Sequence, residues 1–128
     1  MRILGIGVDI LENKRMKLLL NNKRFLSRTF SKNEIKISKN IANKTNFFAK
    51  RFSAKEAFAK SLGTGFRYDL NMKDIEIYNN EEGRPYYNKS KKINDMVYRR
   101  FKIKNYNLFL SISDEKDYSI AFTILETK

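Results

Sequence analysis

Two carboxylates stand out in this sequence because their surroundings suit a bound cation. Asp9 ends a stretch with glycine at two nearby positions, and Glu56 precedes Lys60 by one helical turn. Carboxylate oxygens are ligands for hard cations such as Mg²⁺, Mn²⁺ or Ca²⁺. Each residue also has a plainer explanation: Asp9 as a helix N-cap, and Glu56 with Lys60 as an ion pair on a solvated face.

The composition narrows the chemistry. The sequence has no Cys and no His, which excludes a thiolate nucleophile, a Ser-His-Asp triad and any Cys- or His-ligated metal site. A net charge of +13 favours anionic partners, namely nucleic acid, phosphate-rich cofactors or an acidic protein. The many Lys, Asn and Ile residues also fit an AT-rich genome, which would explain part of this charge without a function.

A segment rich in small residues follows Lys60. It comprises Ser61, Leu62, Gly63, Thr64 and Gly65. A turn of this kind lets backbone N–H groups approach a phosphate. Glycines are also common where a helix ends, and the segment is not a Walker A loop.

A strand has to position the first carboxylate. Residues 3–10 alternate, so one face is apolar and the other holds Gly5, Gly7 and Asp9. Because glycine has no side chain, this face leaves room close to the backbone of the strand, and we expect a bound ligand there. The apolar positions are Leu4, Ile6, Val8 and Ile10.

Helices account for much of the remaining first half. Residues 9–12 match a capping box and predict a helix over about 10–22. A second capping box at 31–34 opens another helix from about residue 32. After a polar break, a long helix is predicted over 46–62 and ends at Gly63.

The long helix carries two cations in the middle of its aromatic face. Arg51 and Lys55 lie one turn apart among phenylalanines, where a plain surface helix would have apolar residues. Either their stems follow the apolar surface, or their charged groups meet an anion or a carboxylate.

The second half predicts strands and one more helix. The elements are a hairpin over 75–87 with its turn at 79–83, a helix near 93–101, and a closing hairpin over 108–124. The whole sequence predicts one α+β domain over residues 1–128, an antiparallel sheet with helices packed on it. No apolar run approaches a membrane span, so we expect a cytoplasmic protein.

Two segments together resemble one protein family. Residues 5–10, Gly-Ile-Gly-Val-Asp-Ile, resemble the opening G-I-G-x-D-I of holo-acyl-carrier-protein synthases, the small bacterial-type phosphopantetheinyl transferases. Residues 51–65 resemble that family's signature R-[FW]-[AS]-A-K-E-A-x-x-K-[AS]-x-G-T-G. Similar stretches at 74–77, 83–85 and 110–121 follow in the family's order, so the resemblance covers the whole chain.

The resemblance implies a reaction and a set of roles. Members of the family transfer 4′-phosphopantetheine from coenzyme A to a serine of apo acyl carrier protein, with Mg²⁺. They release adenosine 3′,5′-bisphosphate and support fatty acid biosynthesis. By resemblance, Asp9 and Glu56 are the metal ligands and, with Lys60, the catalytic residues. Coenzyme A contacts are implied for Arg51, Lys60, Ser61, Gly63, Thr64, Gly65, Gly83, Arg84, Pro85 and Asp114.

One position departs from the family pattern. Asp114 stands where many members have a histidine. We expect Asp114 to hydrogen-bond the cofactor or join the metal shell, and an Asp that opens a turn is the alternative. Without a histidine, we favour a water on the metal as the general base, oriented by Glu56 or another carboxylate.

The resemblance also implies partners. Carrier docking is expected at Arg15, Arg24, Phe25 and Arg28, where positive charge would steer an acidic carrier; a solvated basic face is the alternative. The family's small members are homotrimers with sites between subunits, so a homotrimer is expected. Neither a membrane nor a nucleic acid is expected as a partner.

Two other classes of function stay open at this point. A basic nucleic-acid-binding module would account for the charge and the aromatic content, although the sequence has no nucleic-acid motif. A scaffold that binds coenzyme A or a carrier without catalysis would keep the binding residues and lack transfer.

Overall fold

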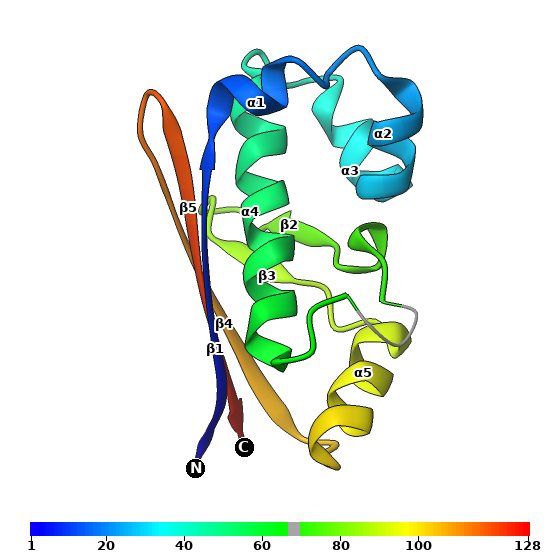
Figure 1. The fold of residues 1–128 in the computed structure, drawn as a ribbon, viewed down its shortest axis with the longest axis vertical. Helices are drawn as coiled ribbons and strands as arrows, with labels where there is room; N and C mark the ends of the chain where they lie inside the picture. The colour runs from blue at the N-terminus through cyan, green and yellow to red at the C-terminus, as the bar shows by residue number, and fades with distance from the viewer. Residues whose placement is uncertain (67–69) are drawn as a thin grey trace.

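A three-stranded antiparallel sheet forms one side of the fold, and one long helix packs against it (Figure 1). The strands are β1 (Ile3–Glu12), β5 (Tyr118–Thr127) and β4 (Tyr106–Asp114), hydrogen-bonded in that order. The helix is α4 (Lys44–Leu62). This computed structural model describes residues 1–66 and 70–128. The arrangement confirms the α+β prediction.

Local sequence signals fix both ends of α4. The Asn43 side chain accepts a hydrogen bond from the backbone N–H of Asn46 at 3.0 Å, so the helix begins slightly earlier than predicted. Gly63 ends the helix with a φ of 78°, a left-handed conformation that suits glycine. The helix ends where the sequence predicts.

The glycine face of β1 contacts α4. A Cβ on Gly5 would overlap the carbonyl oxygen of Ser61, and one on Gly7 would overlap that of Ala57. The two glycines therefore let the helix backbone lie directly against the strand. This corrects the interpretation of that face as room for a ligand, because the protein itself fills the space.

The opposite face of the sheet carries large apolar side chains that the described part of the chain leaves open. Val8 on β1 pairs with Phe122 on β5, and they are 53% and 40% exposed. Ile6 and Ile10 flank Val8 on the same face, and Phe109 on β4 adds to it. The outer face of the sheet thus carries Ile6, Val8 and Ile10 of the predicted apolar face, whereas Leu4 packs against the core because the register of β1 shifts between Ile3 and Gly5. A continuous apolar surface of this kind marks an interaction site.

The segment after Asp9 contradicts one prediction. β1 stays paired with β5 through Glu12, so Asp9 lies within the strand and does not cap a helix. A short α1 (Asn13–Lys17) replaces the predicted helix over 10–22, and no side chain caps it. Strand pairing satisfies the backbone groups that a helix would otherwise have used, which explains why the capping-box pattern fails here.

Two further short helices, α2 (Lys23–Thr29) and α3 (Lys32–Ser38), follow α1. The second capping box is confirmed. Ser31 Oγ accepts the N–H of Glu34 at 3.1 Å, and Glu34 Oε1 accepts the N–H of Ser31 at 2.9 Å. Around them an aromatic cluster joins these helices to the start of α4.

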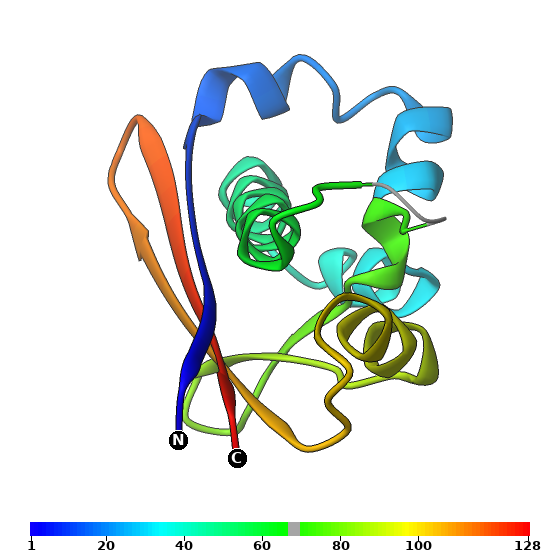
Figure 2. The same ribbon diagram turned by 60° about the horizontal axis from the view of Figure 1, so that its bottom comes forward.

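The remaining elements complete the side of α4 that faces away from the sheet. They are η1 (Met72–Asp74), β2 (Ile77–Asn79), β3 (Pro85–Tyr87) and α5 (Lys91–Phe101). β2 begins at Ile77, two residues after the predicted start of this hairpin, and includes Asn79, which was predicted to lie in the turn. Figure 2 looks almost along α4 and shows the sheet on one side, with the other helices around the rest. None of the helices in the described ranges is long and apolar enough to cross a membrane.

Candidate active site

Asp9 and Glu56 project into one pocket between β1, α1 and α4. The pocket has a volume of about 290 Å³. Asp9 comes from the middle of β1 and Glu56 from α4, which packs along β1 at the two glycines. Its lining is Asp9, Ile10, Leu11, Arg15, Met16, Leu19, Phe52 and Glu56. The pocket is thus lined by two carboxylates, one arginine and several apolar residues.

The charges in this pocket influence one another. Burial, and then the negative charge of Asp9, raise the pKa of Glu56 above its ordinary value, while Lys60 opposes the shift. Lys60 Nζ lies 3.2 Å from Asp9 Oδ1 and donates to the Val8 carbonyl oxygen at 3.0 Å. Among the described residues, Lys60 thus forms its ion pair with Asp9 on another element, and not the pair with Glu56 on the same helix that was the plainer explanation of these two residues.

The donor set fits a hard cation that keeps other ligands. Among the described residues no group of three or more Asp, Glu, His or Cys side chains could hold a metal ion. Two carboxylates from the protein, with waters and phosphate oxygens completing the shell, is the usual arrangement for Mg²⁺. Asp9 and Glu56 therefore fit a hard cation whose remaining ligands come from outside the described residues.

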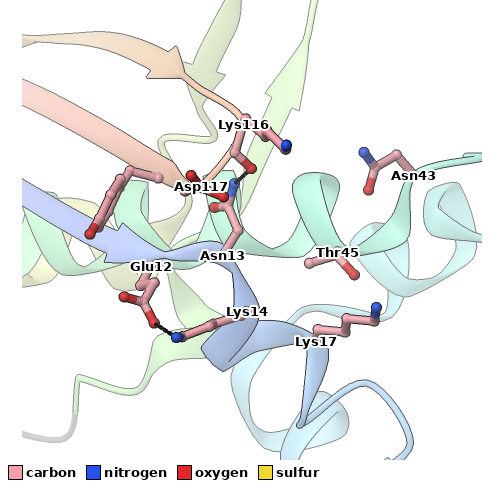
Figure 3. Close-up of a pocket in the computed structure, with 9 residues that line it drawn as sticks. Glu12, Asn13, Lys14, Lys17, Asn43, Thr45, Lys116 and Asp117 are labelled. Carbon is pink, nitrogen blue, oxygen red and sulfur yellow. Dashed lines mark hydrogen bonds and ion pairs between the residues drawn. The ribbon is translucent and has the colours of Figure 1, made fainter.

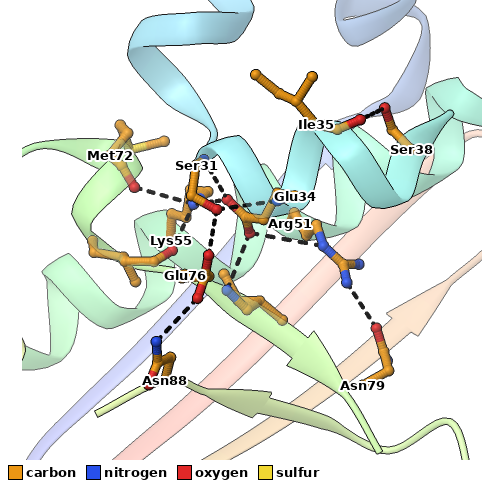
Figure 4. Close-up of polar contacts among 12 residues, drawn as sticks. Ser31, Glu34, Ile35, Ser38, Arg51, Lys55, Met72, Glu76, Asn79 and Asn88 are labelled. Atoms are coloured by element: carbon orange, nitrogen blue, oxygen red, sulfur yellow. Dashed lines mark hydrogen bonds and ion pairs between the residues drawn. The ribbon is translucent and has the colours of Figure 1, made fainter. Parts of the chain in front are cut away.

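A buried ion cluster explains the two cations on the aromatic face of α4 (Figure 4). Lys55 Nζ lies 2.7 Å from Glu34 Oε1, and both side chains are fully buried. The same nitrogen donates to the carbonyl oxygens of Ile75 at 2.5 Å and Met72 at 3.1 Å. Burial lowers the pKa of Lys55, and the Glu34 carboxylate opposes that shift. Of the two explanations from the sequence, the contact with a carboxylate is confirmed.

Arg51 belongs to the same cluster. It is 4% exposed, its Nε lies 3.7 Å from Glu34 Oε2, and its guanidinium lies 4.0 Å from the centre of the Phe47 ring. Internal partners therefore account for Arg51, whose direct contact with coenzyme A stays a prediction. The sequence analysis missed Glu34 because the capping box explained that residue fully as a helix signal.

The other residues expected at coenzyme A lie at separate places. Ser61 is buried, and its Oγ donates to the Phe58 carbonyl oxygen at 2.6 Å, so its side chain points into the helix. Gly63 and Gly65, on either side of Thr64, both have a positive φ. This turn lies at the C-terminal end of α4. Gly83, with a φ of 86°, and Arg84 are exposed in the turn before β3, which begins at Pro85.

Asp114 lies outside the pocket of Asp9 and Glu56. Its Oδ2 accepts a hydrogen bond from Asn46 Nδ2 at 2.9 Å, near the tip of the hairpin formed by β4 and β5. It lines a cavity of about 450 Å³, and a neighbouring cavity of about 620 Å³ is shown in Figure 3. Lys14, Lys17 and Lys116 line this neighbouring cavity, which the sequence analysis did not identify.

The residues expected to dock a carrier lie on α1 and α2. Arg15, Arg24 and Arg28 are exposed, as docking would require. Phe25 is half-buried, and its ring stacks on that of Phe52 with 6.4 Å between centres. Because Arg15 and Phe52 also line the pocket of Asp9 and Glu56, the basic surface borders the two carboxylates directly.

Comparisons with known proteins agree on one family. A family model described as the 4′-phosphopantetheinyl transferase superfamily matches residues 5–123. The holo-[acyl-carrier-protein] synthase of Pelagibacter ubique (strain HTCC1062) is 54% identical over 128 residues, covering 100% of both chains.

Solved structures of such synthases share the fold. One from Bacillus anthracis str. Ames, in complex with CoA (3′,5′-ADP), has a TM-score of 0.82 and 32% identity over 100% of both chains. One from Neisseria meningitidis has a TM-score of 0.85 and 33% identity, covering 98% of this chain and 99% of that one.

Proposed function

Because the chain belongs to the 4′-phosphopantetheinyl transferase superfamily, and within it to the holo-[acyl-carrier-protein] synthases, we propose that it modifies an acyl carrier protein. It transfers 4′-phosphopantetheine from coenzyme A to a serine of the apo carrier and releases adenosine 3′,5′-bisphosphate. The reaction depends on Mg²⁺ and serves fatty acid biosynthesis in the cytoplasm. The observation that carries this proposal is the pocket shared by Asp9 and Glu56 beside Lys60.

Asp9 and Glu56 would hold the metal, because they are the two carboxylates that face this pocket. When bound, Mg²⁺ neutralises and orients the pyrophosphate of coenzyme A. Lys60 would add positive charge at the leaving phosphate, since its ammonium lies 3.2 Å from Asp9 Oδ1.

The serine that reacts belongs to the carrier. Its oxygen bonds to the β-phosphorus of coenzyme A, the bond from that phosphorus to the bridging oxygen breaks, and the adenosine bisphosphate leaves with the electron pair. The serine proton has to pass to a base as this happens. We assign Glu56 the task of orienting the water that takes up this proton, since its carboxyl group lines the pocket where the reaction would take place.

The basic surface on α1 and α2 supports the choice of an acidic carrier as partner. Arg24 and Arg28 are exposed on α2, and Arg15 connects this surface to the pocket. Positive charge around the entrance steers an acidic partner and fixes its orientation. A carrier bound at α1 and α2 would bring its serine next to Asp9 and Glu56.

Two features support a homotrimer with sites between subunits. Arg51 and Glu56 lie about 140° apart around α4, at about 3.6 residues per turn. Arg51 is linked to the turn at Gly83 through Asn79. Within one chain, this turn and the pocket of Glu56 are therefore on different sides of the helix. A neighbouring subunit can supply the second half of the site, and the outer apolar face of the sheet gives it a surface to bind.

The test is to incubate the protein with apo acyl carrier protein, coenzyme A and Mg²⁺ and to weigh the carrier by mass spectrometry. We expect a gain of one phosphopantetheine, which EDTA abolishes. Asp9→Ala and Glu56→Ala should each lower metal-dependent turnover by about 100-fold or more while the circular dichroism spectrum stays unchanged. No gain of mass on a competent carrier would reject the proposal, and normal rates in either variant would reject the metal ligands.

A further inference from the structure

We infer that Asn79 is a positioning residue for coenzyme A, which holds the turn at Gly83, Arg84 and Pro85 in place for the adenosine phosphate. This inference rests on the proposed function, because the turn has a binding role only if coenzyme A is the substrate. It concerns the last residue of β2, which the sequence analysis treated only as turn chemistry.

Asn79 connects the turn to the interior through both ends of its amide. Arg51 Nη2 donates to Asn79 Oδ1 at 2.9 Å, and Asn79 Nδ2 donates to the Gly83 carbonyl oxygen at 3.0 Å (Figure 4 shows the first bond). A guanidinium can only donate and a carbonyl oxygen can only accept. The amide of Asn79 therefore has one orientation that satisfies both neighbours, and it transmits the position of Arg51 to Gly83.

Arg51 is a fixed anchor for this connection. Its side chain is 5% exposed, and Glu34 and the Phe47 ring hold the guanidinium inside the molecule. Its Nε is buried and makes no hydrogen bond to the described residues. Swinging Arg51 out to a phosphate would leave the Glu34 carboxylate with one fewer cation in a buried site, which is costly. We therefore assign Arg51 an indirect role, through Asn79.

Backbone pairing holds the base of the turn, since Asn79 of β2 lies opposite Pro85 of β3 and the Asn80 N–H donates to the Arg84 carbonyl oxygen at 3.0 Å. Asn80 Oδ1 accepts the N–H groups of Glu82 at 3.0 Å and Arg84 at 2.8 Å, so those bonds shape the turn locally. They do not tie it to the rest of the fold. The side chain of Asn79 adds a link from Gly83 to the buried Arg51, directly beside Arg84, whose exposed cation suits a phosphate.

The experiment compares binding of coenzyme A with binding of 3′-dephospho-coenzyme A by isothermal titration calorimetry. Asn79→Leu keeps the size of the side chain and removes both bonds, whereas Asn79→Asp keeps the acceptor for Arg51 and removes the donor to Gly83. Asn88→Leu is the matched control, because Asn88 lies just after β3 and donates to Glu76 at 3.0 Å instead of to the turn.

We expect the wild-type protein to prefer coenzyme A, and Asn79→Leu to reduce that preference by about 3- to 10-fold. Most of the change should fall on coenzyme A itself, with binding of the dephospho form nearly unaltered. Asn79→Asp should show a reduction of the same kind, and Asn88→Leu should keep the wild-type preference.

Unchanged preference in Asn79→Leu, even with a lower unfolding temperature, would show a purely structural role and overturn the inference. If Asn79→Leu does not fold, an unchanged preference in Asn79→Asp overturns it instead. A wild-type protein that binds coenzyme A but transfers nothing would defeat the proposed function, while the ratio of the two affinities would still decide the role of Asn79.

Discussion

Lys60 connects the two elements that carry the candidate site. Its ammonium nitrogen lies 3.2 Å from Asp9 Oδ1 and 3.0 Å from the Val8 carbonyl oxygen, which ties the end of α4 to the middle of β1. The chain thus supplies a cation of its own next to a proposed metal ligand. If Asp9 holds the metal as proposed, Lys60 and the metal ion would be alternative partners for Asp9, and Lys60 would become available to a phosphate once the metal is bound.

Replacing Lys60 should therefore separate metal binding from turnover. Lys60→Met is expected to tighten Mn²⁺ binding to the protein alone by about 2- to 5-fold, because an exposed competing cation is removed. The same change should lower kcat/KM for coenzyme A by about 100-fold, because the leaving phosphate loses a positive charge. Calorimetry with Mn²⁺ and the transfer assay measure the two effects, with Lys104→Met as the control. Weaker Mn²⁺ binding in Lys60→Met would contradict the competition.

The raised pKa of Glu56 predicts a cost to stability at neutral pH. A group whose pKa is higher in the folded than in the unfolded chain stabilises the fold below its unfolded pKa and loses that contribution as the pH rises through its folded pKa. Glu56 is such a group, because burial and then Asp9 raise its pKa. Glu56→Gln should therefore raise the metal-free unfolding temperature at pH 7 by about 1–3 °C.

The pH series supplies the check for Glu56. The difference between Glu56→Gln and the wild type should shrink as the pH falls toward about 4, where glutamates take up protons. Differential scanning calorimetry in EDTA gives both temperatures. Added Mg²⁺ should stabilise the wild type more than the variant. A variant that is less stable than the wild type at pH 7 would show that Glu56 makes a stabilising contact instead.

Because Glu34 and Lys55 form a buried ion pair, we expect substitutions at the two residues to have strongly coupled effects on the free energy of unfolding. Lys55→Met should destabilise the protein by about 3–5 kcal/mol, because it leaves the Glu34 carboxylate with one fewer partner away from water. Glu34→Gln combined with Lys55→Met should cost clearly less than the sum of the two single changes. Urea unfolding of the four proteins forms a double-mutant cycle, and additive losses would mean that the two charges are not coupled.

Charge reversal on α2 should impair the carrier and spare coenzyme A. Arg24→Glu with Arg28→Glu is expected to raise KM for the acyl carrier protein by about 10-fold, more so at low salt, with KM for coenzyme A unchanged. Arg15 is avoided because it lines the pocket of Asp9 and Glu56. Lys102→Glu with Lys104→Glu, at exposed positions after α5, is the control with the same change in net charge. Equal losses for both substrates would argue against a docking surface on α2.

A charge on the outer face of the sheet should break the proposed homotrimer. Val8→Lys or Phe122→Lys would place an ammonium among apolar side chains buried between subunits, at a cost of several kcal/mol per trimer. Light scattering after size exclusion should find a trimer for the wild type and monomers for these variants, with transfer largely lost. Tyr98→Lys, at an exposed aromatic residue on α5, should stay trimeric. A monomeric wild type would refute the assembly.

Short-range signals in the sequence determined several elements correctly. The end of α4 at Gly63 and the capping box of Ser31 with Glu34 follow from residues that contact each other along the chain. The sequence also brought Asp9 and Glu56 together, but only through the family resemblance. Each residue lies in one of the two motifs that carry this resemblance, at 5–10 and 51–65.

Only the tertiary structure decided which faces meet. The glycines of β1 looked suited to a ligand, and they instead contact α4; Asp9 looked like a helix cap, and pairing with β5 keeps it in a strand. Lys60 contacts Asp9, 51 residues away, and Lys55 contacts Glu34, 21 residues away. These contacts depend on how a strand and a helix pack against each other in space. The free energy of burying a charged group or a backbone segment depends on its partners, and residues distant in the sequence supply them.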